Sequence, residues 1–258
     1  MVGKFRVAVA SAIVSCACLS YADASPARSL DSYDPDESFK TLFLKRQVEQ
    51  SMSVGRAIKS IASHYPQEVV SIVDIALDTY PEKYREIIYA AISAQPASSE
   101  DIVQLAIEKG VGSCSSIVKQ AIKAEPSYVD FVVQTAVNAT PDELDEIVRV
   151  AVQIQPDSAD SIVRTLSRNH PNKVIDIMTT ALNAVPYVGE YVVDALLTLF
   201  PTQAEAVVTN AVKHKSLNKA QLARIFTAAK NSGMDEAAIR RIAIENGLGD
   251  DEITAALN

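Results

Sequence analysis

The sequence predicts an all-α fold, an α-solenoid-like array of short antiparallel helices with a 15-residue, proline-punctuated repeat. The first observation behind this prediction is the spacing of proline, because nine of the eleven prolines lie fifteen residues, or a multiple of fifteen, apart. These nine are Pro66, Pro81, Pro96, Pro126, Pro141, Pro156, Pro171, Pro186 and Pro201. Val111 stands where one proline is missing and Ser216 follows the last unit, so the array has one substitution and a defined end.

The second observation is the apolar pattern inside each unit, counted from its proline. In the ten units of residues 66–215, position 7 is Ile or Val, position 8 is Val, Ile or Met, and position 11 is Ala in eight of them. At about 100° per residue, positions 4, 7, 8, 11, 12 and 14 fall on one arc of roughly 160°. A strand would alternate with period two, so the pattern predicts an amphipathic helix despite the strand preference of Ile and Val.

The third observation is the shortness of the joints between units. A unit of fifteen residues leaves about eleven or twelve for the helix and three or four for the joint, and joints this short favour antiparallel neighbours. Helix pairs would then repeat every thirty residues and stack into a two-layer α-solenoid. A single compact orthogonal bundle is the alternative.

Proline marks each joint because it cannot continue a helix and its fixed φ suits the start of the next one. Pro141 is either the first helical residue, with Thr140 as its cap, or the residue before the cap. The second reading is favoured by the good capping residues that follow proline in four units, Ser127, Asp142, Asp157 and Thr202. An acidic residue stands three positions after each of them and predicts a capping box, at Asp130, Asp145, Asp160 and Glu205.

The N-terminal residues predict export. Residues 1–24 combine an early basic segment, an apolar run and small residues at Ala22 and Ala24, as a secretory signal peptide does. The alternative is a lipoprotein signal in which Cys16 is acylated. Residues 25–37 are polar and contain two prolines, which predicts a flexible leader. The expected localisation is secreted or periplasmic.

The rest of the chain divides into a helical repeat domain, residues 38–215, and a C-terminal helical cap, residues 216–258. In the cap, glycine replaces proline as punctuation: Gly233 and Gly247 are expected to end helices, and Asp235 and Asp250 to begin the next ones. Helices are predicted near residues 219–230, 236–245 and 251–257, and they would close the array with a more polar end.

Charge and length exclude two classes of partner. After cleavage at Ala24 the chain has 31 acidic and 22 basic residues, a net charge of −9, whereas nucleic-acid binding needs clustered cations. No membrane span is predicted, because the only long apolar run, residues 7–19, is shorter than the ~20 residues that a bilayer requires.

No motif in the sequence indicates catalysis, a cofactor or a metal. His64, His170 and His214 lie near the ends of units and are not paired at the spacing of zinc ligands. We interpret them as solvent-exposed joint residues. The expectation is therefore a protein that is not an enzyme, with no catalytic residue, no cofactor and no metal site.

Acidic residues recur at positions 5 and 6, where the helix macrodipole favours negative charge. Asp145 with Arg149, and Asp160 with Arg164, are also spaced for i,i+4 ion pairs. A calcium-binding carboxylate surface is the alternative, although no acidic calcium loop occurs in the sequence.

Cys114 is the single cysteine of the mature chain, so an intramolecular disulfide is impossible. It stands at position 4 of the unit that begins with Val111, which predicts a buried, inert thiol. Gly110 and Gly112 in the same region suggest a loose helix start, and an intermolecular disulfide is the alternative.

Five aromatic residues occupy positions that the pattern assigns to the polar arc, namely Tyr89, Tyr128, Phe131, Tyr187 and Tyr191. Phe131 and Tyr191 both stand at position 6, four units apart, so a two-layer stack would place them in the same layer. Exposed aromatic side chains are typical interface anchors. These five residues are the candidate partner-binding site, with packing between helices as the alternative explanation.

The segment Gln155–Val163 resembles the helix starts of tetratricopeptide-type solenoids, with proline followed by polar residues. The likeness covers one joint, since that family repeats every ~34 residues with its own aromatic and glycine signature. No functional residue is carried over from it.

The sequence therefore favours a secreted or periplasmic, non-enzymatic repeat protein that acts as a protein-binding scaffold or cell-envelope component. Self-assembly into an extracellular or surface structure is the alternative, based on the repeats and on residues 186–200, a unit apolar on nearly all sides. A hydrolase with catalytic residues dispersed over a groove is a third hypothesis.

Overall fold

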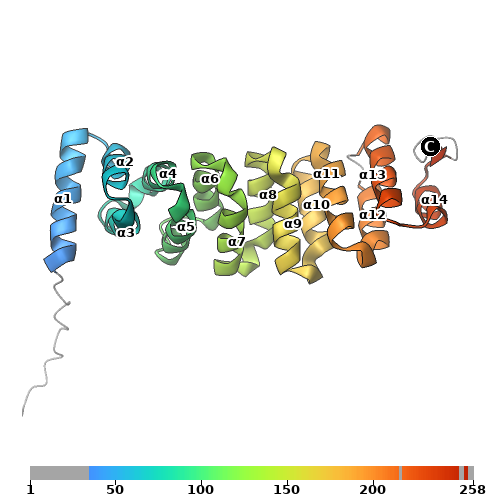
Figure 1. The fold of residues 1–258 in the computed structure, drawn as a ribbon, viewed down its shortest axis with the longest axis horizontal. Helices are drawn as coiled ribbons and strands as arrows, with labels where there is room; N and C mark the ends of the chain where they lie inside the picture. Colours follow the sequence, from blue (N-terminus) through green and yellow to red (C-terminus); the bar gives the residue numbers. More distant parts are fainter. Residues whose placement is uncertain (1–34, 215–216, 250–252, 255–258) are drawn as a thin grey trace, which may run out of the picture. The chain divides into compact units, whose positions relative to one another are not determined.

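A computed structural model describes residues 35–214, 217–249 and 253–254, and every regular element in these ranges is helical (Figure 1). The predicted signal peptide, Cys16 and most of the predicted leader lie outside them. The α-helices are α1 Pro35–Ser51, α2 Val54–His64, α3 Val69–Thr79, α4 Tyr84–Ala94, α5 Ser99–Glu108, α6 Cys114–Ala124, α7 Val129–Ala139, α8 Leu144–Ile154, α9 Ala159–Asn169, α10 Val174–Ala184, α11 Gly189–Leu199, α12 Ala204–Val212, α13 Lys219–Asn231 and α14 Glu236–Glu245.

Each proline of the repeat is the first residue of a one-turn 3₁₀ helix, and the α-helix begins three residues later. At the joint between α8 and α9, Gln155 precedes Pro156 with φ −130° and ψ 70°, outside the α region that a following proline disfavours. The amide of Gln155 donates to the carbonyl of Ala151 at 2.9 Å, and its own carbonyl accepts from the amide of Ser158 at 3.1 Å. Proline therefore ends one helix and starts the next turn while both backbone groups of the residue before it are paired.

The predicted capping boxes after proline are wrong. Ser127, Asp142, Asp157 and Thr202 lie inside the 3₁₀ turns, and the helices that follow have no side-chain cap. The physical reason is that the turn already pairs the first amides with backbone carbonyls. Side-chain caps occur instead at helices that no proline precedes, on Ser53, Ser113, Asn218 and Asp235.

The helices pack in two layers that alternate along the chain. Each helix contacts the next one and also the next but one, as in the series α2, α4, α6 and α8 and the series α5, α7, α9 and α11. We call the odd-numbered helices, with the 3₁₀ turns that precede them, the odd layer, and the others the even layer. The chain bends by 115° at the joint around Pro201, and the array is the α-solenoid-like fold that the sequence predicts.

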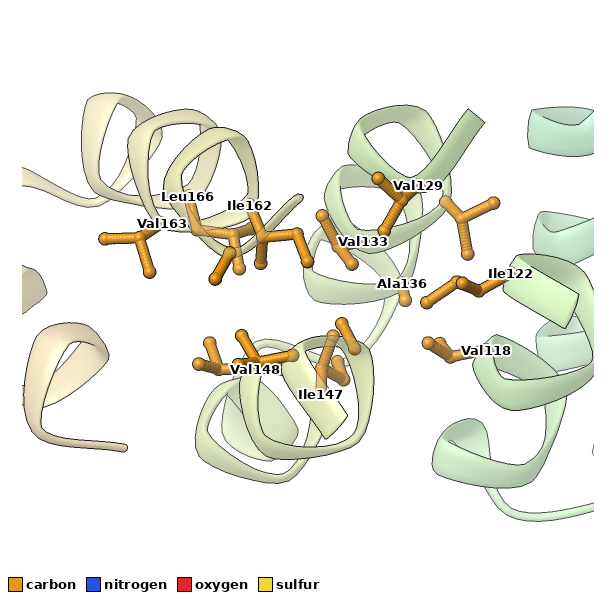
Figure 2. Close-up of a cluster of buried hydrophobic side chains, with 14 of the residues drawn as sticks. Val118, Ile122, Val129, Val133, Ala136, Ile147, Val148, Ile162, Val163 and Leu166 are labelled. Atoms are coloured by element: carbon orange, nitrogen blue, oxygen red, sulfur yellow. The ribbon is translucent and has the colours of Figure 1, made fainter. Parts of the chain in front are cut away.

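The core is the apolar arc of each helix. Ile147, Val148 and Ala151 of α8, at positions 7, 8 and 11, have no solvent-exposed surface. Figure 2 shows the side chains of Ile147 and Val148 pointing into the same apolar core as those of Ile162 and Val163 of α9. Positions 4 and 12 are buried in most units, whereas position 14 is half-buried at the edge of the arc. Alanine at position 11 lets neighbouring helices approach closely.

Polar contacts within a layer recur between residues 31 apart, which is two units plus one residue. The Ser161 hydroxyl donates to Asp130 at 3.0 Å, and Arg85 Nε donates to the Ser116 hydroxyl at 3.2 Å. The amide of Gly55 donates to Glu86 at 2.9 Å. In each case position 5 of one helix meets position 6 of the next helix in its layer.

The two ends of the array differ from the repeats. Helix α1 begins at Pro35, so the last three residues of the predicted leader, 35–37, are helical. At the other end α13 and α14 occupy the predicted ranges, and Gly233 and Gly247 follow them with φ +91° and +85°, as expected for glycine after a helix. Residues predicted to form a further helix, 251–257, lie largely outside the described residues.

Replacement of Ala151 by Leu tests the close packing at position 11. The added side chain has no space between fully buried neighbours, so we expect Ala151→Leu to lower the free energy of unfolding by about 1–3 kcal/mol. The control is Ala206→Leu on the exposed side of α12, which should change it by less than about 0.5 kcal/mol. Urea denaturation followed by circular dichroism measures both, and equal stability of the two variants would contradict the packing argument.

Glu86 ties α4 to the start of α2 and predicts a pH dependence. Hydrogen bonds from the Ser53 hydroxyl and the Gly55 amide lower the pKa of the Glu86 carboxyl below its usual 4.5. A lowered pKa in the folded state stabilises the fold above pH 4.5, and this stabilisation disappears as the pH falls through the folded-state value. Glu86→Gln should therefore lower the urea midpoint at pH 7, and its difference from the native chain should shrink below pH 4.5.

Candidate partner-binding surface

The five predicted aromatic residues divide between the two layers. Tyr128 and Phe131 belong to the turn and helix of α7, and Tyr187 and Tyr191 to those of α11, both in the odd layer. Tyr89 lies on α4 in the even layer. The expectation that Phe131 and Tyr191 share a layer is confirmed. We call the four odd-layer residues the aromatic surface.

Most of the aromatic surface is open to solvent. Phe131 is 50 %, Tyr187 62 % and Tyr191 61 % exposed. The Tyr128 ring is half-buried and lies against the Phe131 ring with 5.7 Å between the ring centroids. Packing between helices therefore does not explain Phe131, Tyr187 and Tyr191. Tyr89 is exposed as well, at 48 %, but on the other layer.

The rest of the same unit is buried, which accounts for its unusual composition. Val192, Val193, Leu196 and Leu197 of α11 have almost no exposed surface, and α11 contacts both α9 and α13. The apolar character of residues 186–200 thus serves the core. The exposed residues of this unit are Tyr187 and Tyr191, at positions 2 and 6, with Asp194 and Thr198.

A row of carboxylates accompanies the aromatic surface. Position 5 is acidic in four successive helices of the odd layer, at Glu100, Asp130, Asp160 and Glu190. Asp130 accepts from Ser161, and Glu190 pairs with Arg224 of α13. The register in which position 5 meets position 6 places Tyr191 beside Asp160 and Phe131 beside Glu100. By this register, each aromatic residue at position 6 stands opposite an acidic residue at position 5 of the preceding odd-layer helix.

The negative charge of the array is concentrated in the same layer. Eleven acidic and three basic residues belong to the odd-layer units, residues 66–80, 96–110, 126–140, 156–170 and 186–200. Nine acidic and seven basic residues belong to the even-layer units, residues 81–95, 111–125, 141–155, 171–185 and 201–214. The odd-layer units of residues 66–200 thus have a net charge of −8, against −2 for the even-layer units of residues 81–214.

The predicted ion pairs are confirmed in one case and wrong in the other. Arg164 pairs with Asp160 at 3.3 Å, four residues before it. Arg149 pairs with Glu146, three residues before it, instead of Asp145, with 3.0 Å between Nε and Oε2. Both spacings bring side chains together on a helix, and Glu146 lies on the same side as Arg149 here.

Cys114 is buried, as predicted, with 4 % of its surface exposed. Burial raises the pKa of its thiol and the negative charge of Glu143 raises it further, although the Thr140 hydroxyl, which donates to Sγ at 3.2 Å, opposes the shift. The helix start is not loose, because Ser113 caps α6. A side chain at Gly112 would displace the Tyr84 ring, since a Cβ atom would lie 2.6 Å from Tyr84 Cζ.

Two of the three histidines lie within hydrogen-bond distance of a described residue. His64 Nδ1 lies 2.7 Å from the carbonyl of Ser60, and His214 Nε2 lies 2.8 Å from Asn183 Oδ1. His64 is exposed, whereas His170 and His214 are half-buried. Among the described residues, no group of three or more His, Cys, Asp or Glu side chains could hold a metal ion.

The sequence interpretation missed a hollow on the even layer. It has a volume of about 540 Å³ and is lined by residues of α4, α6 and α8, among them Arg85, Lys119 and Arg149. The signal was present, because Lys119 and Arg149 both stand at position 9 of units thirty residues apart. We call this hollow the cationic groove.

No known family model matches this chain, and a search of curated proteins finds no significant match. Within the described residues no single helix is long and apolar enough to cross a membrane; one bent pair, Pro186–Leu199 with Pro201–Val212, meets the length and composition criteria together.

The burial and raised pKa of Cys114 predict that its thiol reacts slowly with thiol-specific reagents. Because the thiolate is the reactive form and little of it exists below the raised pKa, we expect the folded protein at pH 8 to react with Ellman's reagent at least about tenfold more slowly than in urea. The rate of thionitrobenzoate release measures this difference. Equal rates in the folded and unfolded states would show that Cys114 is accessible and would support the alternative hypothesis of an intermolecular disulfide.

Proposed function

We propose that the protein is an exported, non-enzymatic helical repeat scaffold that binds a basic segment of a protein partner through its aromatic surface. The single observation that carries this proposal is the exposure of Phe131, Tyr187 and Tyr191 in one layer of the repeats, whose apolar arcs are buried. Large aromatic side chains are energetically costly to leave in water and are typical anchors of protein interfaces. The signal-peptide pattern of residues 1–24 supports export to the periplasm, the cell envelope or the exterior.

The chemistry of the surface selects a basic partner. A tyrosine or phenylalanine ring attracts Lys and Arg through its face, and a carboxylate beside the ring adds an ion pair. By the register of the layer, Asp160 stands opposite Tyr191, and the odd-layer units of residues 66–200 have a net charge of −8. Charge complementarity of this kind speeds association and disfavours acidic partners.

The spacing of the aromatic rings sets the length of the partner segment. Helices α7 and α11 are separated by α9 in the odd layer, so their axes lie about 16–20 Å apart at ordinary helix spacings. An extended chain covers that distance with about five or six residues. A segment that contacts both ends of the aromatic surface would pass over Asp157 and Asp160 of the middle unit.

Self-assembly is less favoured by the described residues. Its main basis was the apolar unit 186–200, and most of that unit is buried in the core. Two copies that met through the odd-layer units of residues 66–200 would also bring two surfaces of charge −8 together, which electrostatic repulsion opposes. A hydrolase site is not favoured by any cluster among the described residues.

Serine substitutions test the aromatic surface. The tagged mature protein, its Phe131→Ser/Tyr191→Ser variant and a Tyr89→Ser control are used to capture proteins from an envelope extract, with recovery quantified by mass spectrometry. We expect the double variant to lose roughly nine tenths or more of one basic protein, since two interface anchors together contribute about 2 kcal/mol or more. Recovery by the Tyr89→Ser control should equal that of the native protein.

The same experiment can refute the proposal. Unchanged recovery by the double variant would show that the aromatic surface does not bind, and loss of an acidic protein would show that the charge argument is wrong. Light scattering at increasing protein concentration tests self-association. An average mass that rises with concentration, and rises less for the double variant than for the native protein, would favour assembly.

A further inference from the structure

The cationic groove lies over α6, between α4 and α8, and nothing in the proposed protein-binding role uses it. Its volume of about 540 Å³ falls in the range of about 300–1,000 Å³ that small-molecule sites occupy. Arg85 comes from α4, Lys119 from α6 and Arg149 from α8, so three successive helices of the even layer contribute one cation each. The groove and the aromatic surface belong to different layers.

Hydrogen-bond donors dominate the polar lining. Besides the three cations, the Ser116 hydroxyl and the side-chain amides of Gln120 and Gln153 line the groove, and each of them can donate. The described residues that line it include no Asp or Glu. In a chain with 32 acidic and 24 basic residues, a hollow of this composition is selective for negative charge.

Two of the three cations have no carboxylate partner among the described residues. Arg149 is paired with Glu146. Arg85 instead donates to the Ser116 hydroxyl at 3.2 Å, and its guanidinium lies 5.2 Å from the centroid of the Tyr84 ring. Lys119 forms no ion pair with a described residue. The groove therefore keeps an excess positive charge that an anionic ligand would neutralise.

The positions of the cations suit a ligand with more than one anionic group. Lys119 and Arg149 occupy position 9 of neighbouring helices in the layer, whose axes lie about 8–10 Å apart. Arg85 is oriented by Ser116 and Tyr84, which reduces the entropy that it loses on binding. A planar guanidinium also suits bidentate contact with phosphate or carboxylate oxygens.

We propose that the cationic groove is a binding site for a small multivalent anion that carries phosphate or carboxylate groups. Lys119 supplies the unpaired charge, Arg85 the oriented guanidinium, and the Ser116 hydroxyl and the glutamine amides the neutral donors. Tyr89 is the one predicted aromatic residue that is not part of the aromatic surface. It stands at position 9 of α4, the same position that Lys119 and Arg149 occupy in α6 and α8. This site does not depend on the protein-binding function.

Isothermal titration calorimetry of the purified protein at low ionic strength tests the site, with inorganic pyrophosphate and citrate as separate probes. We expect saturable one-site binding of at least one probe, weakened as salt is added. Lys119→Gln and Arg85→Gln should each weaken it roughly tenfold, since a charged hydrogen bond is worth about 1.5–3 kcal/mol. Preference for pyrophosphate assigns a phosphate ligand, and preference for citrate a carboxylate.

The matched control is Lys123→Gln, which removes the same charge from the exposed side of α6 without lining the groove. It should bind as the native protein does, and Lys119→Arg, which retains the charge, should bind within a few fold of it. The proposal is overturned if neither probe gives saturable binding, or if Lys123→Gln weakens binding as much as Lys119→Gln. Circular dichroism spectra of the variants verify that the fold is intact.

Discussion

The fold depends on one constraint: an α-helix of eleven residues is too short to be stable alone in water. Each unit must therefore bury its Ile, Val and Ala arc against neighbours on both sides, and the contacts of each helix with the next and the next but one do this. Alanine at position 11 sets the distance of approach, and the paired β-branched residues at positions 7 and 8 fill the space beside it (Figure 2). Stability is a property of the stack, because no single unit has a core of its own.

The joints between units show which features of the fold the sequence pattern predicts and which it does not. Proline spacing and the apolar arc were sufficient to predict helix length and two alternating layers, and glycine spacing was sufficient to predict the positions of α13 and α14. They were not sufficient for the helix starts, because a capping residue such as Asp142 has the same sequence signature whether it caps a helix or lies in a 3₁₀ turn. The backbone hydrogen bonds of the turn decide the matter, and only coordinates show them. Ser53, Ser113 and Asn218 cap helices where proline is absent, so the two devices substitute for one another.

The outer positions follow a different logic from the core. Positions 5, 6 and 9 contribute little to the arc, so the two layers can differ there without cost to packing. Because successive units alternate between the two layers, the number of units between two residues predicts whether they share a layer. This correctly placed Phe131 and Tyr191 in the same layer. The unit number does not predict that Tyr191 is 61 % exposed. Nor does it predict that Arg149 pairs with Glu146, or that Lys119 has no ion-pair partner among the described residues. Those properties depend on side-chain conformations and on which position of one helix meets which position of the next.

The segregation of charge has a consequence for how the two surfaces would operate together. The aromatic surface lies on odd-layer units that have a net charge of −8 over residues 66–200, and the cationic groove lies on the other layer, with the apolar core between them. Residues that share no partner and lie more than about 7–10 Å apart contribute additively to free energies. A ligand in the groove contacts α4, α6 and α8, whereas a partner on the aromatic surface contacts α7, α9 and α11, so any coupling between them must pass through core positions such as Ile147 and Val148. Tightly packed cores resist continuous deformation. If the two proposed surfaces bind their ligands, we therefore expect them to bind independently of one another.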